Sequence, residues 1–150
     1  ARPLISENGT STVVHEMVHV LLSDLATPRD QDWIDEGLAE YLSLRALKDS
    51  GTISTTRYDA TIAEFRRWGA GAVSLRTTSA SGPVTARAVI VFHDLDTELR
   101  QAKRGRQTVA AVVRDFLAAG RQASRDSLQA AAGKVLGHPS RALAALPGLD

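Results

Sequence analysis

The segment VVHEMVHVLL, residues 13–22, limits what this chain can fold into more than any other stretch. Seven of its ten residues are Val, Met or Leu, so a helix here is apolar nearly all round and is expected deep in a core. Ten residues are too few to span a membrane. Because unpaired charge is costly away from water, His15, Glu16 and His19 each need a partner.

The spacing of these three residues suggests what the partner is. On a helix, positions 15 and 19 lie about 40° apart and positions 15 and 16 about 100° apart, so the side chains share one sector. Two neutral imidazoles one turn apart can bind Zn²⁺, and the carboxylate beside them can reach a water on the metal. The rival interpretation is a buried, hydrogen-bonded cluster without metal.

A catalytic zinc usually has three protein ligands, and no third histidine follows closely enough to supply one. The segment WIDEGLAEY, residues 33–41, places Glu36 near the start of a second helix, which a short connection can fold beside the first. We therefore expect Glu36 to be the third ligand. Glu40, one turn later, fits two roles: it accepts the far N–H of a ligating histidine, or it is a solvated charge.

Helical periodicity accounts for nearly every apolar cluster, and no alternating run predicts a strand, so we expect an all-α fold of about six helices. The predicted helices run from Thr10 or Ser11 to about Leu25, from Asp30 or Asp32 to before Gly51, from Ser54 or Thr55 to Trp68, from Pro83 to Leu99, over residues 109–116, and from Ser124 to Val135, with a last turn after Pro139. Residues 69–82 are predicted to be a loop.

With 150 residues, 43% of them hydrophobic, the chain is expected to form one domain over residues 1–150. The absence of cysteine excludes disulfides and thiolate metal sites and leaves the compartment open. The net charge of +1 gives no reason to expect nucleic acid or a membrane as a partner. The oligomeric state is also open.

The charges are nevertheless uneven along the chain. Residues 1–50 carry a balance of −5 and the remainder +6. The aspartates Asp24, Asp30, Asp32 and Asp35 are expected to make the mouth of the site acidic, which favours a divalent cation or a cationic end of a substrate. Seven basic residues without interleaved aromatics are interpreted as a solvated face, not as a nucleic-acid stripe: Arg100, Lys103, Arg104, Arg106, Arg114, Arg121 and Arg125.

HEMVH followed by WIDEGLAEY resembles the gluzincin metallopeptidases, in which the Glu of a W-x-x-E-G-x-x-x-Y segment is the third zinc ligand. The resemblance implies that His15, His19 and Glu36 bind Zn²⁺ and that Glu16 is the catalytic base for hydrolysis of peptide bonds by a zinc-activated water. The stretch ARAVIVFHDLDTELR and the helices after it are similar to the glycyl and alanyl aminopeptidase branches. A zincin-like helical catalytic subdomain with a buried active-site helix is therefore expected.

The chain also departs from that family. The family places a β-rich portion before the first motif and a transition-state-stabilising Tyr where this chain reads VTAR at residues 84–87. We expect either the helical part of a longer precursor or a reduced fold. An upstream amine-binding motif is also missing, so the choice between endo- and exopeptidase action is open.

The donor that would stabilise the transition state has three candidates: Tyr41, Tyr58 and His93. Each also fits an ordinary packing role in a helix. Two alternatives to a peptidase follow from these departures. One is a catalytically inactive gluzincin-like domain with a structural metal, and the other is a helical protein-interaction module.

Overall fold

The computed structural model describes residues 9–102, 105–144 and 146–149. They form seven helices: α1 (Thr12–Leu21), α2 (Asp32–Asp49), α3 (Thr55–Gly69), α4 (Pro83–Ala102), α5 (Val109–Ala119), α6 (Arg125–Leu136) and α7 (Arg141–Ala144). Within these ranges the only β pairing is an isolated bridge between Gln31 and Thr77. The all-α prediction is confirmed. No described helix is both long enough and apolar enough to cross a membrane.

Three helices, α1, α3 and α6, begin at capping residues that the sequence predicts. The Ser11 hydroxyl accepts a hydrogen bond from the Val14 N–H at 3.2 Å, and Ser54 accepts one from the Arg57 N–H at 3.0 Å. Ser124 and Ser127 cap α6 reciprocally. The expected end of the first helix is wrong, however, because α1 stops at Leu21 and a loop begins there.

The predicted cap of α2 is also wrong. The N-cap residue is Gln31, and no side chain caps that end. The Asp32 carboxylate instead accepts a hydrogen bond from the Ala80 N–H at 2.7 Å, while Asp30 forms an ion pair with Arg76 at 3.6 Å. Both carboxylates therefore bind the 69–82 loop and hold it against the start of α2.

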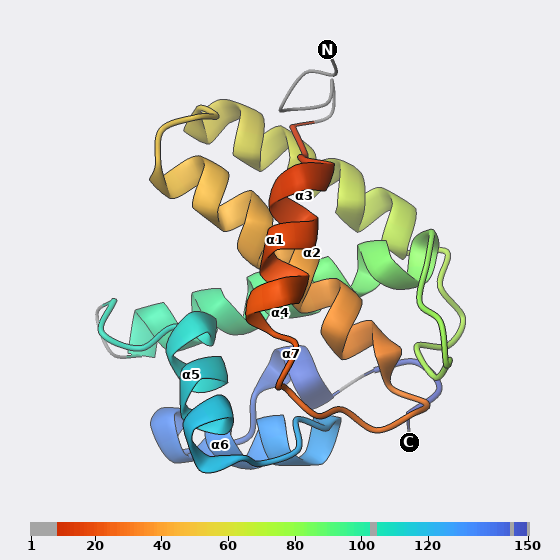
Figure 1. Cartoon of the computed structure of the whole chain (residues 1–150), viewed down its shortest axis with the longest axis vertical. Helices are drawn as coiled ribbons and strands as arrows, with labels where there is room; N and C mark the ends of the chain where they lie inside the picture. Colours follow the sequence, from red (N-terminus) through yellow and green to blue (C-terminus); the bar gives the residue numbers. More distant parts are fainter. Residues whose placement is uncertain (1–8, 103–104, 145, 150) are drawn as a thin grey trace.

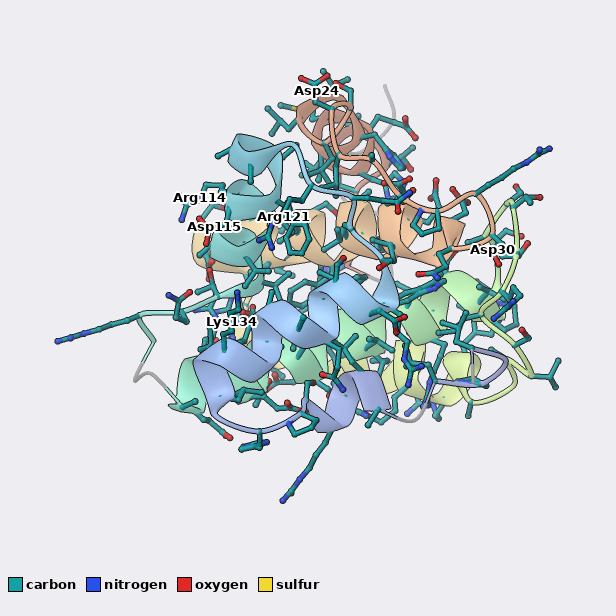
Figure 2. All side chains as sticks on the ribbon, turned by 90° about the horizontal axis from the view of Figure 1, so that it is seen from below. Asp24, Asp30, Arg114, Asp115, Arg121 and Lys134 are labelled. Carbon is teal, nitrogen blue, oxygen red and sulfur yellow. The ribbon has the colours of Figure 1, made fainter. Side chains whose placement is uncertain are left out.

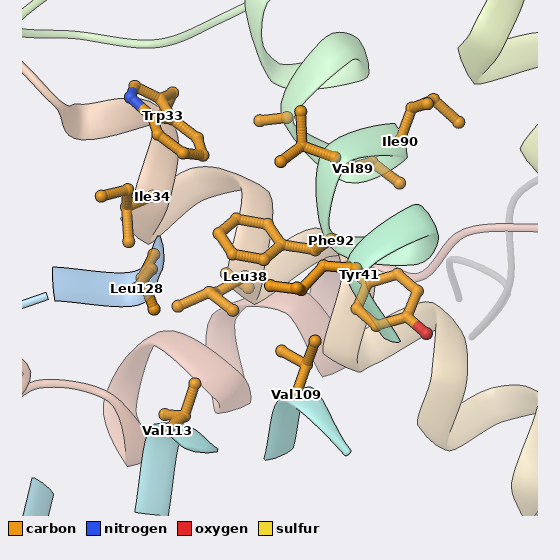
Figure 3. Packing of buried hydrophobic residues seen from close by; sticks show 14 of the residues in the cluster. Trp33, Ile34, Leu38, Tyr41, Val89, Ile90, Phe92, Val109, Val113 and Leu128 are labelled. Carbon is orange, nitrogen blue, oxygen red and sulfur yellow. The ribbon is translucent and has the colours of Figure 1, made fainter. Parts of the chain in front are cut away.

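Helix α4 is the centre of the fold and contacts α2, α3, α5, α6 and α7 (Figure 1). The rings of Trp33 from α2 and Phe92 from α4 stack with centroids 5.7 Å apart, among buried side chains from α5 and α6 (Figure 3). A Cβ atom at Gly37 would lie only 2.6 Å from the Cβ of Ala88. The absence of a side chain at Gly37 is therefore what lets α2 approach α4 so closely.

Helix α1 packs on α2 and lies at the surface, which corrects the expectation of a buried active-site helix (Figure 1). Val18 is its only buried residue. Its outer face exposes four apolar side chains by 56–74%: Val13, Met17, Val20 and Leu21. An apolar sequence indicates which side chains favour burial, but within the described part of the chain no element covers this face.

Candidate metal centre

The two histidines of HEMVH lie one turn apart on α1, at the edge of the face that packs on α2. Their side chains are 14% exposed for His15 and 28% exposed for His19. The two Nε2 atoms are 3.0 Å apart, and the rings meet edge to face with centroids 4.6 Å apart. The pair therefore presents two ring nitrogens to a single point at the α1–α2 boundary.

Glu36 brings its carboxylate to the same point from α2. One oxygen, Oε2, lies 3.4 Å from His15 Nε2, and the other, Oε1, lies 3.1 Å from His19 Nε2. The loop that folds α2 back is fixed by a hydrogen bond from the Thr27 hydroxyl to Asp35 at 2.8 Å and by one from the Ala123 N–H to the Ala26 carbonyl at 2.8 Å. His15, His19 and Glu36 are thus brought together as the sequence predicts.

The separations of these ligand atoms can be tested against zinc. Bonds of about 2.0–2.1 Å in a tetrahedron put neighbouring ligand atoms about 3.3 Å apart. The observed separations are 3.0, 3.1 and 3.4 Å. Two neutral imidazole nitrogens and one carboxylate are also a ligand set that zinc accepts. The three side chains therefore bring two imidazole nitrogens and a carboxylate to separations close to those of neighbouring zinc ligands, with a different Glu36 oxygen facing each histidine.

Glu40 makes the contact with the histidine pair that the sequence suggested. Its Oε2 lies 2.6 Å from His15 Nδ1, and both side chains are 14% exposed. This hydrogen bond raises the pKa of His15, against the lowering effect of burial, and the charges of Glu40, Glu36 and Glu16 raise it further. Since a carboxylate can only accept, Nδ1 carries the proton and Nε2 of the neutral ring keeps its lone pair for a metal.

Glu16 follows His15 on α1 and is exposed to solvent. In the described structure it forms no hydrogen bond or ion pair with another side chain, although its charge contributes to the raised pKa of His15. Its carboxylate is therefore exposed and has no partner among the described side chains.

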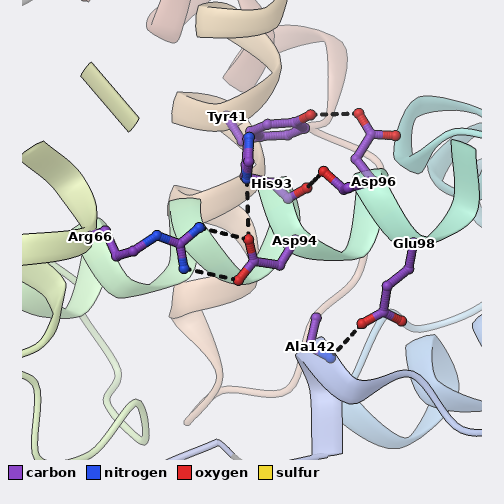
Figure 4. Close-up of polar contacts among 8 residues, drawn as sticks. Tyr41, Arg66, His93, Asp94, Asp96, Glu98 and Ala142 are labelled. Atoms are coloured by element: carbon purple, nitrogen blue, oxygen red, sulfur yellow. Dashed lines mark hydrogen bonds and ion pairs between the residues drawn. The ribbon is translucent and has the colours of Figure 1, made fainter. Parts of the chain in front are cut away.

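The structure does not bring Tyr58 or His93 to the metal cluster. Tyr58 is 2% exposed, with the Lys48 ammonium 4.5 Å from its ring centroid. His93 packs between the rings of Tyr58 and Tyr41, at centroid distances of 6.0 and 6.3 Å, and its Nδ1 lies 3.2 Å from Asp94 (Figure 4). These contacts are those of a packed core, so the predicted catalytic roles of Tyr58 and His93 have no support in the geometry.

Tyr41 is likewise used in the core. Its hydroxyl donates to buried Asp96 at 2.5 Å, and burial is the main reason why its pKa lies far above the usual value (Figure 4). The pKa of Asp94, which contacts the neighbouring His93, is shifted the other way. Burial acts to raise its pKa, but hydrogen bonds from His93 and Arg66 outweigh burial and lower the pKa to about 2. The Tyr41 phenol therefore links α2 to α4 and offers no proton to the metal cluster.

The acidic mouth expected from the sequence is only partly formed. Asp32 and Asp35 line a cavity of about 250 Å³ together with His19 and Glu36. Burial raises the pKa of Asp35, while the hydrogen bond from Thr27 lowers it. Asp24 and Asp30 are not among the residues lining this cavity and lie well apart along the loop (Figure 2). Two of the four predicted aspartates therefore face the site.

Three of the seven basic residues of the predicted solvated face have structural partners. The Arg125 guanidinium donates to the carbonyls of Leu143, Ala144 and Leu149, Arg121 lies 4.4 Å from the Phe116 ring centroid, and Arg100 pairs with Asp96 at 3.1 Å. Asp115 lies near Arg114 and Arg121 (Figure 2). Two residues of the predicted face, Lys103 and Arg104, lie outside the described residues.

Sequence reasoning missed one part of the site. A second cavity, of about 310 Å³, adjoins Glu36 and Glu40 and is lined by Phe65, Trp68 and residues at the start of α4. Trp68 is the last residue of the predicted third helix, and it is 53% exposed. No local pattern distinguishes such a tryptophan from a core residue, because its exposure depends on how α3 ends against α4.

Comparisons with family models, with curated proteins and with solved structures give no match to this chain.

Proposed function

We propose that this chain is a zinc-dependent metallopeptidase of gluzincin type with a zincin-like helical fold. The observation that carries the proposal is the convergence of three side chains: His15 Nε2 and His19 Nε2 are 3.0 Å apart, and the two Glu36 carboxylate oxygens lie 3.4 and 3.1 Å from them. The side chains come from two helices, are 14–29% exposed and have separations close to those of neighbouring zinc ligands. A set of three protein ligands, which is what the described residues offer, is typical of a catalytic zinc site, whereas structural zinc sites usually have four.

The roles of the residues follow from their contacts. His15, His19 and Glu36 hold the ion, and Glu40 orients the His15 ring and fixes its tautomer through the 2.6 Å hydrogen bond. Zinc bound there would supply Lewis-acid chemistry, which lowers the pKa of water so that a nucleophile for a peptide carbonyl is available near neutral pH. Glu16, exposed and unpaired with any described side chain, takes the proton from the attacking water and delivers it to the leaving amine.

A second candidate is an inactive domain in which the metal is a structural staple. It is favoured by the position of Tyr41, Tyr58 and His93, whose described contacts are with residues outside the metal cluster. None of the three donors considered for the oxyanion therefore reaches the metal cluster. The two candidates share the metal and differ in whether Glu16 acts on a substrate.

Metal content tests the part that both candidates share. Purified protein should carry close to one zinc per chain by elemental analysis, and Glu36→Ala should lose it. Glu16→Gln should retain it, because Glu16 is not a ligand. Glu64→Gln, an exposed glutamate of α3, is the matched control. Zinc content that Glu36→Ala leaves unchanged would refute the site.

Peptide hydrolysis separates the two candidates. The zinc-loaded protein should cleave a mixed peptide library, with cleavage abolished by a chelator and by Glu16→Gln while Glu64→Gln cleaves normally. Zinc binding without any cleavage that depends on Glu16 would reject the peptidase and leave the structural metal.

A further inference from the structure

The cavity of about 310 Å³ beside the metal cluster has two unlike sides. Glu36 and Glu40 of α2 form one side, and the other side combines the apolar side chains of Phe65, Trp68, Ala80 and Ala86 with Thr10, Ser81, Gly82 and Thr85. Binding pockets for whole small molecules run from about 300 to 1,000 Å³, so this cavity is at the small end of that range. Its size suits one large side chain better than a complete ligand.

Trp68 is far more exposed than the other aromatic side chains of the chain. The other large aromatic side chains Trp33, Tyr41, Phe92 and Phe116 are fully buried, whereas Trp68 keeps 53% of its surface in solvent. An indole face left open beside a polar cluster resembles an unfilled contact surface more than a core position.

The backbone next to the indole is closely packed. The residue after Trp68, Gly69, approaches α4 so closely that a Cβ atom there would lie 2.6 Å from the Arg87 backbone nitrogen. The indole itself lies beside the 80–82 loop, since a Cβ at Gly82 would be 4.0 Å from Trp68 Cζ2. The Asp32 carboxylate anchors that loop at Ala80. Trp68 therefore projects from a closely packed helix end, with one edge of its indole beside an anchored loop.

We propose that this cavity binds an aromatic or other bulky apolar side chain of a peptide substrate, from a residue that flanks the scissile bond, and that Trp68 determines this specificity. The inference rests on the proposed peptidase function, because Glu36 belongs to both the metal cluster and the cavity wall. A peptide carbonyl held at the metal puts its neighbouring side chain within reach of the cavity.

The carboxylates in the wall do not favour a basic side chain instead. Glu36 is used by the metal cluster, and Glu40 is used by His15 Nδ1 at 2.6 Å. Both charges therefore have partners before a substrate enters. Phe65 is 8% exposed and Ala86 is fully buried, so the apolar surface that remains to be covered is mainly the face of Trp68, and contact with a phenyl ring covers it best.

A peptide library tests this specificity. The zinc-loaded protein should favour Phe, Tyr, Leu or Met at one position next to the cleaved bond. Trp68→Ala should lower kcat/KM for a Phe-containing peptide by about tenfold to a hundredfold and change that of its Ala-containing counterpart little. For the Phe-containing peptide, the kcat/KM of Trp68→Phe should lie between that of the wild type and that of Trp68→Ala. Val73→Ala is the control, since Val73 is 91% exposed and lies outside the cavity.

A binding measurement tests the cavity without turnover. The chain has two tryptophans, and Trp33 is fully buried, so the quenchable emission comes from Trp68. In zinc-loaded Glu16→Gln, a Phe-containing tetrapeptide should protect this emission from iodide quenching, and the Ala-containing tetrapeptide should protect it far less. Circular dichroism and zinc content of Trp68→Ala confirm that its fold is intact.

The outcomes separate the two proposals. Three outcomes would overturn the specificity proposal and leave the peptidase, provided that cleavage needs Glu16. They are cleavage without a preference for bulky apolar residues, a preference for Lys or Arg, and an apolar preference that survives Trp68→Ala. Absence of cleavage together with unprotected Trp68 emission would overturn both. Protection by the Phe peptide without cleavage would support the cavity and reject the peptidase.

Discussion

Glu40 tests the metal centre most sharply because it touches the site without being a ligand. Its carboxylate holds His15 Nδ1 at 2.6 Å, with both side chains 14% exposed, so the hydrogen bond is short, charge-assisted and largely shielded from water. Loss of such a partner to a metal-ligating histidine typically weakens metal binding by about tenfold to a hundredfold. Glu40→Gln keeps an acceptor but loses the charge, so we expect it to weaken zinc binding about tenfold, or by about 1.4 kcal/mol. Glu40→Ala leaves His15 Nδ1 without a partner, so we expect it to weaken zinc binding about a hundredfold.

The assay is competition for zinc with a fluorescent chelator at neutral pH, read as the dissociation constant of each variant. Glu64→Gln removes a glutamate charge from an exposed position of α3 and should bind zinc as the wild type does. The order should be wild type, Glu40→Gln, Glu40→Ala, from tightest to weakest. If both Glu40 variants bind zinc within twofold of Glu64→Gln, then Glu40 does not orient His15 for a metal, and the assignment of the ligand nitrogen is wrong.

Three further predictions concern the frame that carries the site. Gly37→Ala should destabilise the protein by about 1–3 kcal/mol in urea unfolding, because the added methyl would meet the Cβ of Ala88 at 2.6 Å; wild-type stability would contradict this packing. Tyr41→Phe should lower the free energy of unfolding by about 1–2 kcal/mol in the same assay, since Asp96 loses a buried donor. An unchanged unfolding midpoint would show that this hydrogen bond does not stabilise the fold. Val20→Lys, at a position 73% exposed, should change stability by no more than about 0.5 kcal/mol, and unfolding would mean that the outer face of α1 is covered.

The sequence predicts the parts of the site that depend on the spacing of residues within one helix. His15 and His19 share a helix face because they are four residues apart, and the Ser11, Ser54 and Ser124 caps follow from capping chemistry within three residues. Glu36 was predicted because a short connection can fold the second helix beside the first, and the resemblance to the gluzincins implies the same ligand. Glu40 was considered because it lies one turn after Glu36. The structural part of these inferences needs only helix geometry and one short loop.

The errors concern contacts between distant segments. Asp32 was expected to cap α2, but its carboxylate binds Ala80, 48 residues later. Tyr58 and His93 were candidates because of their chemistry, and only the packing of α3 and α4 shows that they meet Tyr41 and Lys48 in the core. The exposure of Trp68 depends on the same packing. An amphipathic pattern identifies an apolar face and does not specify what lies against it.

The geometry of the site depends on how α2 is held. Glu36 and Glu40 lie on a face of α2 that borders Gly37 and Tyr41, and these two residues set the distance and the register between α2 and α4. A shift of about 1 Å in α2 would move both carboxylates relative to the histidines of α1, and it would also widen or close the cavity against Trp68. Substitutions in this core are therefore expected to weaken zinc binding and apolar side-chain recognition together. Substitution of Trp68 should affect recognition alone, which makes the two kinds of variant experimentally distinct.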